Sequence, residues 1–121
     1  MTTPGPRQRR EVLADLIGLR SSLDTAIAAV RELPWDSDVE LVQLARTNVE
    51  DLLHRYLRGE LSAADLEAWA NAVESREDIG LEHGHEELLG AFLFETANPL
   101  LAEPISHSYA RRWLKQIGSG W

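Results

Sequence analysis

The chain has 121 residues and a net charge of −8, because 20 acidic residues outnumber 12 lysines and arginines. This length is typical of a single domain, and the absence of cysteine excludes a disulfide framework, a catalytic thiol and a thiolate metal site. The negative charge argues against nucleic acid and anionic membranes as partners and favours a basic protein. The start of the chain has no apolar leader and no apolar run could span a bilayer, so we expect a cytoplasmic protein.

The first half of the chain carries the pattern of two long helices. Residues 1–6 are small and proline-rich, which predicts a disordered lead. Apolar residues then recur every three or four positions across 7–33 and predict one long amphipathic helix, with Gly18 tolerated inside it. The same spacing across 37–57 predicts a second helix, and the two would form a long N-terminal helical hairpin.

The third predicted helix has the clearest start signal. Ser62 and Asp65 resemble a capping box ahead of an apolar series at helical spacing. This helix should fade near Asp78, where Gly80 is a natural C-terminal breaker.

Two further helices are expected after it. One helix is predicted over residues 84–97. It should end there because Asn98, the residue before Pro99, avoids the helical region. A last helix of about ten residues would begin at Ser106 or Ser108, ahead of a frayed tail at 118–121.

The sequence therefore predicts an all-α fold of five helices in one domain over residues 7–117, with a long N-terminal helical hairpin and three shorter helices and no convincing strand. The apolar positions of these helices predict a core. Its expected members are Leu16, Leu23, Ile27, Val49, Leu53, Leu66, Trp69, Val73, Leu89, Phe92, Leu93 and Trp113.

Charge is concentrated in one part of the chain. Residues 60–98 hold ten acidic residues and a single cation, Arg76, so this stretch carries −9. An arginine among so many acids favours a structural ion pair with Glu74, Asp78 or a carboxylate of another helix, since its fork suits carboxylates. The alternative is that Arg76 and its acidic neighbours face a ligand or partner. Phosphate is a poor ligand here, because the surrounding field repels anions.

The same stretch resembles a set of small helical bacterial proteins of poorly defined function. Their common pattern is a "YL.G.LS...L..WA" helix, an "E.R.DIG.E" turn and a downstream "ANP", which this chain matches over residues 56–99. The residues that carry the resemblance are Trp69, Ala70, Glu74, Arg76, Asp78, Ile79, Gly80, Ala97, Asn98 and Pro99. The chain is also loosely similar to bacterial toxin-immunity proteins, which are small, acidic and helical. That resemblance implies a basic toxin domain as the partner.

A histidine-containing loop is the one cluster that suggests metal chemistry. His83 and His85 lie among Glu82, Glu86 and Glu87, and such side chains bind Zn²⁺. Two histidines separated by one residue do not converge on one ion from a helix, so we expect no metal and no cofactor. The chain also lacks a nucleophile elbow, a phosphate-binding glycine loop and a dinucleotide fingerprint.

The sequence favours a non-enzymatic module that binds a basic protein through the acidic residues 60–87. The predicted contact residues are Glu74, Arg76, Glu77, Asp78, Glu82, Glu86 and Glu87. Two alternatives stay open. One is a metal-dependent enzyme that uses His83 and His85 with nearby carboxylates, and the other is a homodimer or larger scaffold built on the long first helix.

Overall fold

A computed structural model describes residues 5–34, 39–74 and 76–119. Within these ranges the chain forms six helices and one parallel sheet of two strands. The elements are α1 (Pro6–Gly18), α2 (Leu23–Arg31), β1 (Val42–Leu44), α3 (Arg46–Leu57), α4 (Ala63–Glu74), β2 (Ile79–Leu81), α5 (Glu86–Ala97) and α6 (His107–Ser119). The predicted helical character is confirmed, whereas the predictions of five helices and of no strand are wrong.

The predicted helix over residues 7–33 is two helices, so the long N-terminal helical hairpin does not exist. The chain breaks at Leu19, which adopts the left-handed conformation with a φ of 45°. Arg55 of α3 donates a hydrogen bond to the Leu19 carbonyl at 3.0 Å. Asp15 accepts hydrogen bonds from the main-chain N–H of Ser21 at 3.0 Å and from its hydroxyl. The scaffold hypothesis thus loses the long helix on which it was built.

A new helix starts at once, because Ser22 caps α2. Its hydroxyl accepts a hydrogen bond from the Thr25 N–H at 3.3 Å, as an N-cap serine does. The result is a pair of short helices, α1 and α2, that pack against each other.

The predicted helix over residues 37–57 is also wrong in its first part. Residues 35–38 lie outside the described residues, and 42–44 form β1 before α3 begins at Arg46. Val42, Gln43 and Leu44 pair in parallel with Ile79, Gly80 and Leu81 of β2. Gly80 is therefore a strand residue and not a helix breaker.

Helices α4 and α5 match their predictions except at their ends. Ser62 and Asp65 exchange hydrogen bonds of 2.8 and 3.1 Å, which confirms the capping box. Helix α4 ends at Glu74 and not near Asp78, and α5 begins at Glu86 rather than at residue 84.

The last helix is longer than predicted. Ser106 is its cap, since the Ser106 hydroxyl accepts from the Tyr109 N–H at 3.2 Å. Helix α6 has 13 residues and continues to Ser119, into the predicted tail. The rest of that tail, 120–121, and most of the predicted lead, 1–4, lie outside the described residues.

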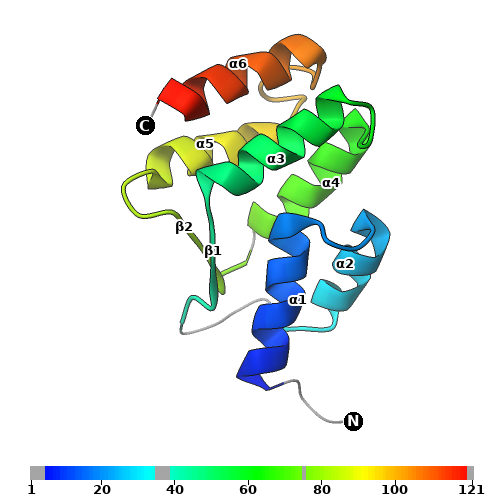
Figure 1. The fold of residues 1–121 in the computed structure, drawn as a ribbon, viewed down its shortest axis with the longest axis vertical. Helices are drawn as coiled ribbons and strands as arrows, with labels where there is room; N and C mark the ends of the chain where they lie inside the picture. The colour runs from blue at the N-terminus through cyan, green and yellow to red at the C-terminus, as the bar shows by residue number, and fades with distance from the viewer. Residues whose placement is uncertain (1–4, 35–38, 75, 120–121) are drawn as a thin grey trace.

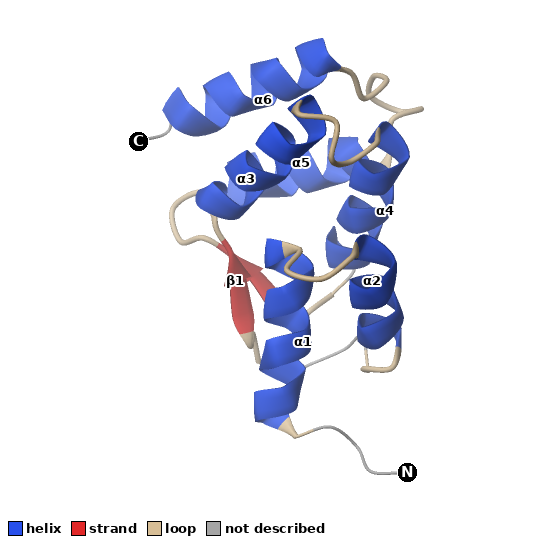
Figure 2. Ribbon diagram, turned by 45° about the vertical axis from the view of Figure 1, so that its right-hand side comes forward, coloured by secondary structure: helices blue, strands red, loops and turns tan. Residues whose placement is uncertain are grey.

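The helices form two groups that α4 joins. Figure 1 shows α3, α5 and α6 together in the upper part, α1 and α2 in the lower part, and α4 running between them. The most extensive helix interface is that of α4 with α5, while α3 packs on α6 and α2 packs on α4. Figure 2 shows the strand pair beside α1, below α3.

The core is aromatic at its centre. Phe92 and Trp113 meet edge to face with ring centroids 5.3 Å apart, and Trp69 is fully buried. The Trp69 indole N–H donates to the Leu16 carbonyl at 2.9 Å. Ten of the twelve predicted core residues are buried, and the other two, Leu23 and Ile27, are half-buried against the core.

Candidate functional site

The central pair of the predicted site, Arg76 and Asp78, lies inside the protein. The Asp78 side chain has no exposed surface, and that of Arg76 is 6% exposed. Arg76 donates from Nε and Nη2 to the two carboxylate oxygens of Asp78, each at 2.9 Å. The prediction that Arg76 forms a structural ion pair is confirmed, with Asp78 as the partner.

A second arginine completes this cluster. Arg9 of α1 donates to Asp78 Oδ2 from Nε at 3.2 Å and from Nη2 at 3.1 Å. The sequence reasoning missed Arg9, because 69 residues separate it from Asp78 and no local pattern links them. We call Arg9, Asp78 and Arg76 the buried triad.

The triad also binds the end of α2. Arg76 donates to the carbonyls of Val30 at 3.2 Å and Pro34 at 2.6 Å, and Arg9 donates to Pro34 at 3.0 Å. The Val30 carbonyl also accepts from the Leu33 N–H at 3.0 Å, so Arg76 reinforces the turn that ends α2. The triad therefore ties α1, the C-terminal end of α2 and the start of β2 together.

Burial of Arg76 changes the charge of the surface above it. Arg76 is the one Lys or Arg in residues 60–98, so its removal from solvent leaves carboxylates as the exposed fixed charges of this stretch. Four of the predicted contact residues are exposed: Glu74, Glu77, Glu86 and Glu87. We call these four carboxylates the acidic surface; a fifth exposed carboxylate of the stretch, Glu60, is paired with Arg55 and Arg58.

Glu82, another predicted contact residue, is held by α3. It accepts hydrogen bonds from the Arg46 main-chain N–H at 2.8 Å and from Nε and Nη2 of the same residue at 3.1 and 2.9 Å. These bonds hold the pKa of Glu82 below its usual value. Because Arg46 is the first residue of α3, Glu82 fastens the loop after β2 to the start of that helix.

The two histidines point to different carboxylates. His83 is 98% exposed, with Nδ1 3.7 Å from Glu86, whereas His85 Nε2 lies 3.9 Å from Glu82. The main-chain N–H of Glu86 itself, followed by that of Gly84 at 2.8 Å, lowers the pKa of Glu86. Among the residues that the structure describes, no group of three or more His, Cys, Asp or Glu is placed to hold a metal ion.

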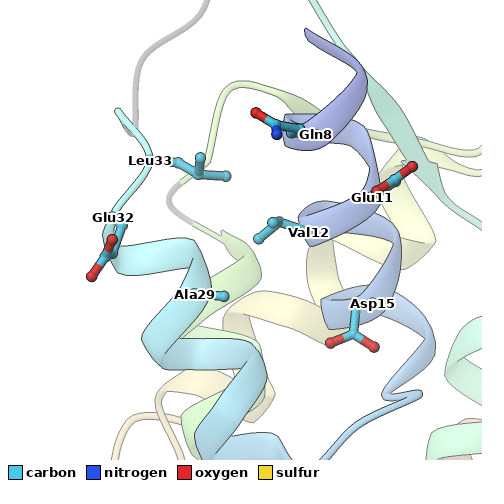
Figure 3. Close-up of a pocket in the computed structure, with 7 residues that line it drawn as sticks. All are labelled: Gln8, Glu11, Val12, Asp15, Ala29, Glu32 and Leu33. Carbon is cyan, nitrogen blue, oxygen red and sulfur yellow. The ribbon is translucent and has the colours of Figure 1, made fainter. Parts of the chain in front are cut away.

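An open groove lies between α1 and α2, where the sequence reasoning expected one continuous helix. Its volume is about 540 Å³, and its lining residues are Gln8, Glu11, Val12, Asp15, Ala29, Glu32 and Leu33. Figure 3 shows Val12 and Leu33 directed into the space between the two helices, with Glu32 on the outer side of α2. The signal that could have revealed the groove is the Ser22 cap, which divides the two helices.

A comparison of the chain with protein-family models, curated proteins and solved structures gives no match. In the described parts of the chain, no helix has the length and apolar character needed to cross a membrane.

Proposed function

We propose that this protein is a non-enzymatic binding module that holds a basic protein partner against its acidic surface, in the manner of an immunity protein that binds a toxin domain. The observation that supports this proposal most is the burial of Arg76 in its ion pair with Asp78. Within residues 60–98, the pair removes from the surface the one Lys or Arg that would oppose a cationic partner.

Charge of one sign over a surface has a defined effect on association. It raises the rate at which an oppositely charged partner arrives and repels partners of like charge. Exposed ion pairs contribute little each, about 0–1 kcal/mol, so the binding should depend on several carboxylates together. Binding of this kind weakens as salt rises.

The proposal is tested with matched charge variants and a partner found by an interaction screen of proteins from the same genome. The test variant neutralises three exposed carboxylates of the acidic surface: Glu74→Gln, Glu77→Gln and Glu87→Gln. The control variant neutralises exposed carboxylates elsewhere, on α2 and α3: Asp24→Asn and Asp51→Asn. Calorimetry with the purified partner should show affinity about tenfold weaker for the test variant, and nearly unchanged for the control.

Two results would count against the proposal. Equal affinity of wild type and test variant would show that the acidic surface is not the contact, and binding that ignores salt would show that charge is not the cause. The immunity-like role has its own assay, in which the partner alone arrests growth and co-expression of this protein restores it. A harmless partner that still binds with the expected salt dependence would remove the immunity role and keep the binding role.

A further inference from the structure

The groove between α1 and α2 combines an apolar floor with an acidic rim. Val12 and Ala29 are half-buried and Leu33 is 6% exposed, so the floor can receive an apolar side chain from outside. Its volume of about 540 Å³ lies within the range of sites that enclose a small ligand or a few side chains.

The charged residues that line the groove are all acidic. They are Glu11, Asp15 and Glu32. The Asp15 carboxylate is held in place by Ser21. Glu11 lies 3.7 Å from Arg7 in a pair whose side chains are 93% and 70% exposed, which is a weak, solvated contact. A cation at the rim of the groove can therefore compete for these carboxylates.

The walls of the groove are fixed before anything binds. At one end Arg9 of α1 donates both to Asp78 and to the carbonyl of Pro34, which follows α2. At the other end Asp15 holds the turn between the helices. A preformed groove loses less conformational entropy on binding than a flexible one.

The groove is also connected to the acidic surface. Arg76 is bonded to the carbonyls of Val30 and Pro34, so the end of α2 that carries Glu32 and Leu33 lies against the segment that contains Glu77.

We infer that this groove docks a basic amphipathic segment of a partner protein, with an apolar side chain on the floor and flanking lysines or arginines at the three carboxylates. An anion placed at the three carboxylates would be repelled by them, and a purely apolar ligand would leave them without counter-charges. The inference rests on the proposed function in one respect, namely that the partner is basic, and adds where the partner's anchor sits.

The test uses a synthetic peptide of leucines flanked by lysines, and a matched peptide with glutamates in place of the lysines. Titration of the ¹⁵N-labelled full chain with the lysine peptide should move the amide signals of the groove residues, and the glutamate peptide should move none of them. The double variant Glu11→Gln with Glu32→Gln should weaken binding about tenfold, whereas Asp24→Asn with Asp51→Asn should leave it within about twofold.

A second pair of variants tests the floor. Ala29→Phe should fill the groove and abolish the shifts, whereas Ala28→Phe, on the exposed side of α2, should leave them in place. Signals that move only around residues 74–87 and respond only to the Glu74, Glu77 and Glu87 changes would overturn the groove inference and keep the acidic surface. A lysine peptide that moves neither region would contradict both. If the amide signals of the groove residues shift as the protein concentration rises without any peptide, the groove binds a second copy of the chain. That result also overturns the inference.

Discussion

Replacement of Asp78 by alanine should be the most damaging single change in a charged side chain of the described residues. Asp78 accepts four hydrogen bonds from two guanidinium groups and is fully buried. Asp78→Ala leaves Arg9 and Arg76 side by side without a counter-charge. Arg76 has little access to water at 6% exposure, while Arg9, at 19%, regains some hydration.

The size of the loss follows from this geometry. Removal of one partner from a buried ion pair costs about 3–5 kcal/mol. Because Arg9 regains some hydration while Arg76 does not, we expect a loss of about 4 kcal/mol, in the middle of that range. A chain of 121 residues has a free energy of unfolding of roughly 6–18 kcal/mol. The variant should therefore lose between about a fifth and two thirds of its stability.

Urea denaturation of wild type, Asp78→Ala and Arg76→Lys measures this loss. Arg76→Lys keeps the charge but loses the fork, so it cannot donate to Asp78 and to the carbonyls of Val30 and Pro34 together, and we expect an intermediate loss. The matched control is Glu74→Gln, an exposed carboxylate on α4, with a change within about 0.5 kcal/mol.

Salt separates a buried triad from a surface pair. At 1 M salt the Debye length is about 3 Å, which screens exposed pairs but hardly affects buried ones. The loss in Asp78→Ala should thus be similar in low and high salt. A loss below about 1 kcal/mol, or one that vanishes in high salt, would refute the reasoning, because both are properties of an exposed pair.

Three further changes have defined outcomes. Trp69→Ala should cost about 3–5 kcal/mol, since the ring is fully buried and its N–H serves a carbonyl of α1; a melting temperature within a degree of wild type would contradict this. The Arg46–Glu82 bonds lower the pKa of Glu82 in the folded state, so they should stabilise the fold fully above the ordinary glutamate pKa and lose that contribution as the pH falls through the folded-state pKa. Glu82→Gln should therefore flatten the acid limb of a curve of stability against pH. An unchanged acid limb would count against this explanation. His83→Ala with His85→Ala should leave stability unchanged; stoichiometric zinc in the wild type that the double variant loses would favour the metal alternative.

The local features of this protein were readable from its sequence. Ser62 and Asp65 lie three residues apart and form the predicted capping box, because both partners belong to the same helical turn. The apolar faces of α4, α5 and α6 follow from spacings of three and four, and Trp69 and Phe92 are buried as predicted. The composition also located the acidic stretch and the unusual position of Arg76 within it.

Tertiary contacts decided the remaining features. Leucine in the left-handed conformation costs about 1–2 kcal/mol, so the break at Leu19 depends on the burial of its side chain, which is 4% exposed, and on the hydrogen bond from Arg55. Strands of three residues are too short for an alternating pattern, and β1 forms because it pairs with the distant β2.

The candidate site shows the same division. The sequence indicated that Arg76 would pair with a carboxylate, but only the fold brings Arg9 to Asp78 from 69 residues away and buries Arg76 and Asp78 with Arg9 beside them. The groove between α1 and α2 exists because the chain reverses at Leu19, and helical periodicity cannot distinguish two short antiparallel helices in phase from one long helix. Periodic burial and capping depend on residues a few positions apart, so they can be predicted from the sequence. Strained turns, strand pairs and buried ion pairs depend on partners that only folding brings into contact.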